Sequence, residues 1–167
     1  MHKEIIGSKI FQNKESFTLT LNRWRFQQKK IVFTNGCFDL LHLGHIDYLS
    51  KAADAGDVLI VGLNSDRSVT EIKGAGRPIT NEKARTQILA SLIFVSVVIL
   101  FDENNPYELI KFIQPDVLIK GADYKPEEII GYDIVKAKGG TVITIDFLPG
   151  YSTSGIEQCI VKNHAKR

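Results

Sequence analysis

Five short apolar runs, rich in β-branched residues, recur along the chain, and a segment with helical character follows each of them. The runs are continuously apolar rather than alternating, which is typical of strands that helices cover on both faces. Strands that alternate with helices form a mostly parallel sheet, because right-handed crossovers leave few other arrangements. The sequence therefore predicts an α/β fold with a doubly wound, five-stranded parallel sheet. The expected strands are Lys30–Thr34, Val58–Leu63, Val95–Phe101, Val117–Lys120 and Thr141–Phe147.

Helices are expected between these strands and near both ends of the chain. N-cap residues and glycines indicate where they begin and end. In the first helix, Leu19, Leu21, Trp24 and Phe26 are expected on or near the buried side. The expected helices are Lys14–Gln28, Leu43–Ala55, Arg67–Ile72 behind an Asp66 cap, Asn81–Leu92 behind a Thr80 cap, Asn105–Gln114, Pro126–Lys138 and Thr153–Asn163 behind Ser152.

The composition excludes several classes of protein. The 167 residues fit a single domain, and a formal net charge of +2 is too small to argue for a nucleic-acid surface. Cys37 and Cys159 lie far apart in sequence, which indicates neither a disulfide framework nor a metal site and favours a reducing compartment. The longest apolar run is too short to span a bilayer. We therefore expect a cytoplasmic protein with no membrane or nucleic-acid partner.

The first expected strand runs into Thr34–His45, which carries the pattern H-x-G-H at the start of a helix. In doubly wound sheets, ligands bind beyond the carboxyl ends of the strands. Gly44 leaves space over the first helical turn, where unpaired N–H groups attract anions. His42 and His45 project from one side of that turn and can donate hydrogen bonds to phosphate oxygens. The pattern favours a phosphate site, with packing or capping roles for these residues as the alternative.

Two other side chains of this segment have open roles. Asp39 is either a turn-forming residue or a contact for Mg²⁺ or for a ligand amine. Cys37 is most simply a small, packed loop residue, since nothing in the sequence marks it as a nucleophile. Zinc binding by the two histidines is not favoured, because a third ligand at a suitable spacing is missing.

A glycine-rich loop at Lys73–Pro78 carries two cations, Lys73 and Arg77. Such a loop can close over phosphates, with the arginine giving bidentate recognition and the lysine a point charge. Arg85, on the next helix, is either a further phosphate contact or a structural ion-pair partner.

Three more segments place polar groups at strand ends or at a helix start. Asn64 and Asp66 follow the second strand, and Asp66 is suited to cap the helix that begins there, a role that does not exclude contact with a ligand. Lys120 ends the fourth strand beside Gly121, a pairing suited to an anionic substrate. The serine and threonine run at 152–154 opens the last helix as an N-cap run.

Four motifs, in this order, resemble the cytidylyltransferase-like nucleotidyltransferase superfamily: KIVFTNGCFDLLHLGHIDYLSKAADAGDVLIVGLNSD, KGAGRPI, VLIKGADYKPEEIIG and GYSTSGI. Within it the chain is most similar to the heptose-1-phosphate adenylyltransferases, which occur alone or as the C-terminal half of bifunctional heptokinase/adenylyltransferases. The resemblance covers the chain from Lys29 to Ile160. H-x-G-H alone is shared with class I aminoacyl-tRNA synthetases, whereas its combination with KGADY is much more specific.

The resemblance implies a Rossmann-like sheet in the strand order 3-2-1-4-5. It implies one nucleotidyltransferase domain over residues 1–167, with residues 1–28 as an N-terminal extension that carries one helix. His42, His45 and Lys120 are the implied catalytic residues. Nucleotide binding is expected of Thr34, Asn35, Gly36, Cys37, Phe38, Gly44, His45, Lys73, Arg77, Gly121, Ser152 and Thr153. Substrate binding is expected of Asp39, Asn64, Asp66, Lys120 and Asp123.

The same resemblance implies Mg²⁺ as cofactor, held through the phosphates of ATP rather than by the protein alone, and a homodimer. Some relatives carry a basic residue after the isoleucine of the last motif, where this chain has Glu157 after Ile156. The contribution of the last helix to triphosphate binding is therefore left open.

By resemblance, the chain transfers AMP from ATP to D-glycero-β-D-manno-heptose 1-phosphate, giving ADP-heptose and pyrophosphate for lipopolysaccharide core synthesis. Glycerol-3-phosphate cytidylyltransferases share G-C-F-D and H-x-G-H and are the main alternative, although KGADYKPEEIIG argues against them. Another small-molecule nucleotidyltransferase of the H-x-G-H type is a broader alternative. A nucleotide-binding regulatory module is the non-enzymatic alternative, and the presence of both histidines argues against it.

Overall fold

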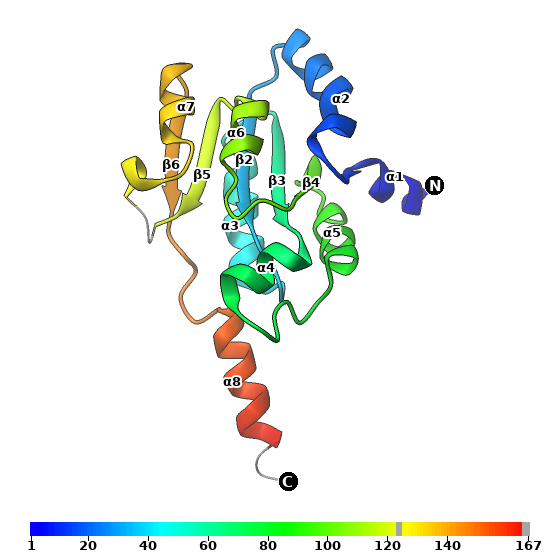
Figure 1. The fold of residues 1–167 in the computed structure, drawn as a ribbon, viewed down its shortest axis with the longest axis vertical. Coiled ribbons are helices and arrows are strands. Elements are labelled where there is room, and N and C mark those ends of the chain that lie inside the picture. The colour runs from blue at the N-terminus through cyan, green and yellow to red at the C-terminus, as the bar shows by residue number, and fades with distance from the viewer. Residues whose placement is uncertain (123–124, 165–167) are drawn as a thin grey trace.

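The computed structural model describes residues 1–122 and 125–164, which form a six-stranded parallel sheet. The strand order is β1-β4-β3-β2-β5-β6 (Figure 1). The direction in which the chain winds reverses between β2 and β5, so the carboxyl ends of these neighbours form the switch point where ligands bind in such sheets. The strands are β1 (Ile10–Phe11), β2 (Ile31–Gly36), β3 (Val58–Asn64), β4 (Val97–Phe101), β5 (Val117–Gly121) and β6 (Thr141–Ile145).

The parallel α/β sheet is confirmed, but the prediction of five strands is wrong, because a sixth strand lies at one edge. This strand, β1, pairs with β4 through Ile10 and Val98, and the Val98 N–H donates to the Lys9 carbonyl at 2.8 Å. The five predicted strands keep the order 3-2-1-4-5 among themselves. A strand of two residues is too short to give a periodic pattern, so the sequence did not reveal it.

Helices cover both faces of the sheet, and α8 projects away from it beyond the carboxyl ends of the strands (Figure 1). The helices are α1 (His2–Ser8), α2 (Lys14–Phe26), α3 (Leu43–Ala53), α4 (Asp66–Lys73), α5 (Glu82–Ala90), α6 (Tyr107–Ile113), α7 (Tyr132–Ala137) and α8 (Thr153–His164), with a 3₁₀ turn η1 at Pro126–Glu128.

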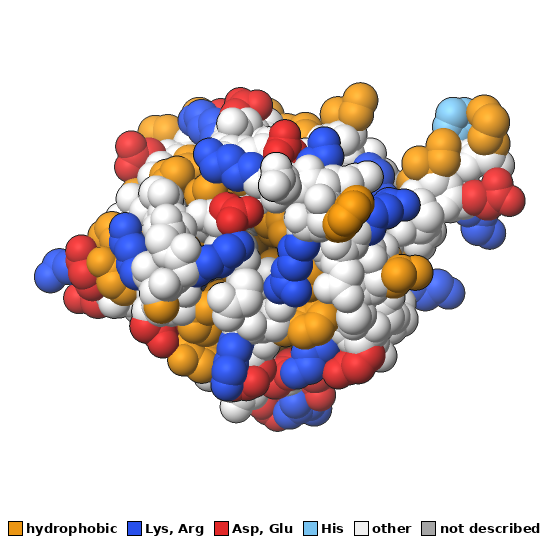
Figure 2. Space-filling view, turned by 90° about the horizontal axis from the view of Figure 1, so that it is seen from above, with side chains coloured by type: hydrophobic (Ala, Val, Ile, Leu, Met, Phe, Trp, Pro, Cys, Tyr) orange, Lys and Arg blue, Asp and Glu red, His pale blue; other side chains and the backbone are white. Residues whose placement is uncertain are grey.

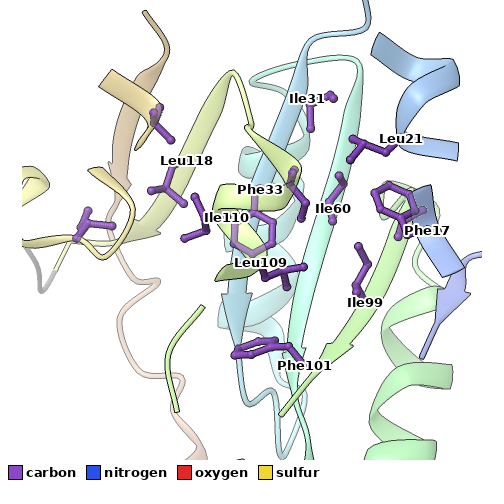
Figure 3. Packing of buried hydrophobic residues seen from close by; sticks show 14 residues of the cluster. Phe17, Leu21, Ile31, Phe33, Ile60, Ile99, Phe101, Leu109, Ile110 and Leu118 are labelled. Carbon is purple, nitrogen blue, oxygen red and sulfur yellow. The ribbon is translucent and has the colours of Figure 1, made fainter. Parts of the chain in front are cut away.

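The core consists of two hydrophobic clusters, one on each face of the sheet. Neighbouring residues of β2 alternate between them, since Phe33 belongs to the first cluster and Val32 to the second. Figure 3 shows the first cluster, in which Phe17 of α2 and Ile110 of α6 pack against the sheet. Leu49 of α3 packs on the opposite face. Burial on both faces explains why the strands are continuously apolar in sequence.

The buried side of α2 differs from the prediction. Phe17 and Leu21 are buried and Trp24 packs against them, at the spacing of one helix face. Leu21 and Trp24 were expected there. Leu19 and Phe26 are 82% and 91% exposed, so their predicted burial is wrong. The sequence offered apolar residues on both sides of this helix, and only the packing against β4 and α6 decides between them.

Two predicted segments have a different local structure. The predicted helix Pro126–Lys138 is wrong, because η1 and α7 replace it, separated by Gly131 with a left-handed φ of +91°. A glycine adopts this conformation without steric cost and interrupts a helix there. The extension at residues 1–28 was expected to carry one helix, but it holds α1 and β1 as well as α2.

Two helices begin at caps next to the predicted ones. Ser65 rather than Asp66 caps α4, and Asn81 rather than Thr80 caps α5, each accepting an N–H of the first helical turn. Asp66 and Thr80 make other contacts, described below.

The face at the amino ends of the strands, opposite the switch point, carries interspersed basic and acidic side chains (Figure 2). A hollow there is lined by Arg25, Lys29, Lys30, Asp116 and Lys138, among others. Lys138 pairs with Asp116 at 2.7 Å, and both Arg25 and Lys138 donate to carbonyls at the end of α6. These two cations therefore stabilise a helix end. Within the described ranges, no helix is long and apolar enough to cross a membrane.

Candidate active site

A pocket of about 430 Å³ lies at the switch point, where β2 and β5 end. The loop after β2, the first turns of α3, the end of α4 and the segment leading into α8 form its walls. Its lining residues are Asn35, Gly36, Cys37, Phe38, Asp39, His42, Gly44, His45, Tyr48, Lys73, Lys120, Gly121, Phe147, Tyr151, Ser152 and Thr153.

Most of the predicted site residues therefore lie around one pocket. Four of them do not line it: Thr34, Asn64, Asp66 and Arg77. Asp123, predicted to bind substrate, lies outside the described residues.

A larger hollow of about 730 Å³ near the start of α2 contains none of the predicted site residues. Its arginine, Arg67, is already paired with Asp102 and Glu71. The smaller pocket is therefore the candidate site.

The two histidines lie together at the start of α3. His42 is the N-cap residue, with an extended backbone, and His45 follows in the first turn. Their rings stack with centroids 3.8 Å apart and planes inclined by 21°. The Nδ1 atom of each ring is buried and has no hydrogen-bond partner among the described residues. Buried polar atoms are rarely unpaired, so these nitrogens indicate a site that a ligand completes.

Both imidazoles are neutral at pH 7. Burial lowers the pKa of His42 below its usual 6.5. Burial, followed by the nearby His42 and Lys73, lowers the pKa of His45 to about 4. A neutral imidazole keeps one N–H to donate. The pair can thus donate hydrogen bonds to an anion, while Lys73 and Lys120 supply positive charge to the pocket.

Neighbouring residues fix the orientation of these rings. The Phe38 ring packs edge-on against His45 at a centroid distance of 5.2 Å. At Gly44, a Cβ atom would lie 3.1 Å from the Nδ1 of His42 and 3.3 Å from the Cβ of Tyr151. The glycine is therefore needed for the close approach of His42 and Tyr151 over the helix start.

Replacing Gly44 with alanine should lower kcat by about tenfold to 100-fold, because the new methyl group displaces His42 by a few tenths of an ångström or more. The free energy of unfolding should fall by about 1–3 kcal/mol, as for other overpacked sites. Gly7→Ala is the matched control, since nothing lies within 4 Å of a Cβ at that helical position. Steady-state kinetics and denaturant unfolding measure both effects. Full activity in Gly44→Ala would contradict this role.

Two lysines enter the pocket from different elements. Lys73 ends α4, and Lys120 lies near the end of β5, where its Nζ donates to the Asn35 carbonyl at 3.3 Å. The Ser152 Oγ accepts the Gly155 N–H at 3.0 Å, so this serine caps α8 as predicted. The pocket thus has cations on one side and a capped helix start on another.

The thiol of Cys37 is not activated. Burial raises its pKa, an effect that the nearby Lys73 and Arg85 only partly offset. The thiol stays protonated at neutral pH and is a poor nucleophile. This agrees with its interpretation as a packed loop residue.

Asp39 is buried and fully engaged by the protein. Its carboxylate accepts the N–H groups of Ile79 and Thr80 at 2.8 Å and 2.9 Å and pairs with Arg77 at 2.9 Å. Burial raises its pKa, but these N–H groups and the guanidinium outweigh it and hold the pKa below the ordinary value. Asp39 therefore anchors the segment before α5 while it also lines the pocket, and its contact with a substrate stays a prediction.

The guanidinium of Arg77 lies between two carboxylates. One nitrogen bonds Asp39, and another forms an ion pair with Glu157 of α8. These partners raise the pKa of Arg77, with Asp39 contributing most. In this structure the Arg77 side chain is thus engaged by the protein, and its direct contact with phosphate stays a prediction.

Three other predicted contacts have structural roles. The Asn64 amide donates to Ser68 at 2.9 Å, which holds the start of α4. Asp66 pairs with Arg85 at 2.7 Å. The Thr34 hydroxyl lies 2.7 Å from that of Tyr48 and orients this ring in the pocket wall.

The completely buried side chain of Arg85 holds together the loops around the pocket. Besides Asp66, it donates to the carbonyls of Cys37 at 2.7 Å, Asn64 at 2.9 Å and Thr80 at 2.9 Å. It thereby joins the ends of β2 and β3 to the segment before α5. Arg85 was predicted to be either a phosphate contact or a structural ion-pair partner, and these contacts fit the second role.

Sequence reasoning missed three aromatic residues of the pocket wall, Tyr48, Phe147 and Tyr151. The Tyr48 and Phe147 rings are stacked at 6.5 Å. The position of Tyr48, one turn after His45 on the same helix, was a usable signal. Phe147 and Tyr151 follow β6 in an irregular segment, where sequence carries little information about direction.

The protein alone offers little to a metal ion. Within residues 1–122 and 125–164, no group of three His, Cys, Asp or Glu side chains could hold one. The oxygens of Asp39 are occupied, as described above. A divalent cation in this pocket would therefore be coordinated by phosphate oxygens and water.

The chain is similar to part of several longer bacterial proteins. It is 50% identical over 148 residues to bifunctional protein HldE of Nitrobacter hamburgensis, which covers 89% of this chain and 30% of the relative. It is 45% identical over 172 residues to bifunctional protein HldE of Geobacter metallireducens, covering 98% of this chain and 35% of the relative. The chain thus spans about a third of the length of the curated relatives it matches.

Two solved structures share the fold. The lipopolysaccharide core biosynthesis protein from Thermoplasma volcanium is 28% identical, with a TM-score of 0.56 over 72% of this chain and 97% of that one. Pantoate-beta-alanine ligase from Francisella tularensis is 20% identical, with a TM-score of 0.60 over 90% of this chain and 76% of that one. The second similarity concerns the fold alone.

The family model described as Cytidylyltransferase-like matches residues 33–158. This range begins in β2 and ends in α8, so it contains every described lining residue of the pocket. The chain belongs to the Cytidylyltransferase-like family.

Proposed function

We propose that this chain transfers AMP from ATP to D-glycero-β-D-manno-heptose 1-phosphate, giving ADP-heptose and pyrophosphate for lipopolysaccharide core synthesis. The observation that carries the proposal is the neutral, stacked pair His42 and His45 in a pocket that also holds Lys73 and Lys120. Unpaired donors and cations around one cavity suit a polyphosphate. The similarity to HldE proteins and to a lipopolysaccharide core biosynthesis protein supports the sugar substrate.

The reaction is an in-line displacement. A phosphate oxygen of the sugar phosphate attacks the α-phosphorus of ATP, the bond to the bridging oxygen of the β-phosphate breaks, and pyrophosphate leaves. A phosphate monoester has a second pKa near 6 and is already mostly ionised at neutral pH. No general base is needed, which agrees with an Asp39 carboxylate that is fully engaged by the protein.

Catalysis then depends on positioning and on charge stabilisation. His42 and His45 donate hydrogen bonds to phosphate oxygens as charge develops on them. Lys73 at the end of α4 and Lys120 near the end of β5 grip phosphates, and the start of α8 at Ser152 offers N–H groups to the triphosphate. Mg²⁺, held through the phosphates of ATP, would neutralise part of the charge on the leaving pyrophosphate.

Several finer features belong to the same proposal. The domain extends over residues 1–167, the enzyme acts in the cytoplasm, and the chain forms a homodimer. The chain corresponds to about a third of its bifunctional relatives, so only one of their two activities is proposed for it.

Pyrophosphate release should be fastest with ATP, heptose 1-phosphate and Mg²⁺ together, among four nucleoside triphosphates tested against a panel of sugar 1-phosphates and glycerol 3-phosphate. A coupled pyrophosphate assay measures the rates, and product mass identifies ADP-heptose. Removal of the divalent cation with a chelator should abolish turnover, because the triphosphate charge is then unshielded.

The panel also separates the alternatives. Faster turnover with CTP and glycerol 3-phosphate would replace the proposal by a glycerol-3-phosphate cytidylyltransferase. Nucleotide binding without turnover on any substrate would favour a regulatory module.

A further inference from the structure

The helix that carries part of the pocket wall is weakly attached to the fold. Ser152 and Thr153 line the pocket at the start of α8, whereas most residues farther along the helix are exposed, including Ile160 and Val161. Figure 1 shows α8 projecting beyond the body of the molecule. A single helix of this length is only marginally stable by itself in water. Its orientation must therefore come from the few contacts near its first turns.

One such contact is the ion pair between Glu157 of α8 and Arg77. The two side chains are 29% and 21% exposed, so both charges are largely withdrawn from water. A pair of this kind is screened less by salt than an exposed one. It lies about one helical turn after Thr153, where it can set the direction of the first turn.

The other end of this contact is rigid. Arg77 also bonds Asp39, whose side chain is 1% exposed and accepts the backbone N–H groups of Ile79 and Thr80. The loop after β2, the segment before α5 and the last helix are thereby linked through one guanidinium. Asp39 lines the pocket, as do Ser152 and Thr153 at the start of α8, so the guanidinium links two parts of the pocket wall.

We propose that Glu157 is a positioning residue, which acts through Arg77 to hold the start of α8 over the pocket so that Ser152 and Thr153 meet the bound triphosphate. This inference rests on the proposed nucleotide site. It assigns Arg77 to the helix rather than to phosphate, and it gives a role to the Glu157 carboxylate.

Glu157→Gln should weaken ATP binding by about three- to tenfold, which corresponds to losing a partly buried ion pair. Calorimetric titration with Mg-ATP measures the affinity, and kcat at saturating ATP should stay within about twofold. Glu157→Asp, which keeps the charge on a shorter side chain, should recover part of the affinity. Gln158→Ala is the matched control, because its exposed side chain lies on the same helix turn. It should bind ATP like the parent protein.

Hydrogen exchange of the nucleotide-free protein tests the same contact without ATP. Amides of 153–160 should exchange faster in Glu157→Gln than in Gln158→Ala, with the sheet unchanged in both. Equal exchange, or unchanged ATP affinity in Glu157→Gln, would overturn the proposal. Tighter ATP binding would also overturn it, since Glu157 would then compete with phosphate for Arg77. Faster exchange in Glu157→Gln, combined with a parent protein that binds no ATP, would uphold the contact and reject the proposed function.

Discussion

His45→Ala should lower kcat by roughly 10²–10³-fold, the loss found when one preorganised donor to developing charge is removed. Because the imidazole is neutral, the loss comes from a missing hydrogen bond rather than from a missing charge. Steady-state turnover with ATP and heptose 1-phosphate measures it. His42→Ala should change kcat in the same direction, since the two rings are stacked against one another.

His45→Ala should lose no more than about 1 kcal/mol in the free energy of unfolding. Its ring shares a hydrogen bond with the Leu40 backbone, while its buried Nδ1 has no hydrogen-bond partner among the described residues. Asp47→Ala, two residues along the same helix, removes an ion pair with Lys51 and is the control that should keep full activity. A destabilised but fully active His45→Ala protein would contradict the mechanism and return His45 to a packing role.

Arg85→Met should have the largest effect on folding, a loss of about 3–5 kcal/mol in the free energy of unfolding. The methionine has a comparable length but leaves the carbonyls of Cys37, Asn64 and Thr80 without their donor in a buried setting. Equilibrium denaturation in urea measures the change. Because the same residue joins the loops of the pocket, catalytic efficiency should fall as well.

Arg67→Met is the matched control for this prediction. Arg67 also lies beside the end of β3, and it makes ion pairs with Glu71 and Asp102, but its side chain is 55% exposed. Exposed pairs contribute about 0–1 kcal/mol. Similar losses in the two variants would show that burial of Arg85 is not what makes it important.

The strands could be predicted from the sequence, because burial on both faces makes each of them continuously apolar. The sixth strand could not, since β1 has two residues and exists through its pairing with Val98. Helix positions followed from caps and glycines, but Gly131 divides a segment whose composition was helical throughout. Where apolar residues occupied both sides of α2, tertiary packing alone decided which side was buried.

The location of the site could be predicted, because it depends on where the backbone places residues relative to strand ends and helix starts. The histidine pair follows a strand and opens a helix, and both features are visible in sequence. The ion-pair partner of a charged side chain could not be predicted, because it lies on a segment that is distant along the chain. Asp39 and Arg77 were expected to meet ligands, yet they bond one another, and Arg77 also pairs with Glu157.

The internal pairing of the arginines has a consequence for how the pocket recognises its ligand. Arg77 and Arg85 are committed to the protein, so the cations that line the described pocket are both lysines, Lys73 and Lys120. A guanidinium fixes two oxygens in one plane, whereas an ammonium on a flexible stem follows a single oxygen as it moves. In an in-line displacement the three equatorial oxygens of the transferred phosphorus invert as the bond to the leaving group breaks. Lysine side chains in the pocket wall can follow single oxygens through that change, while the paired arginines hold the surrounding loops in place.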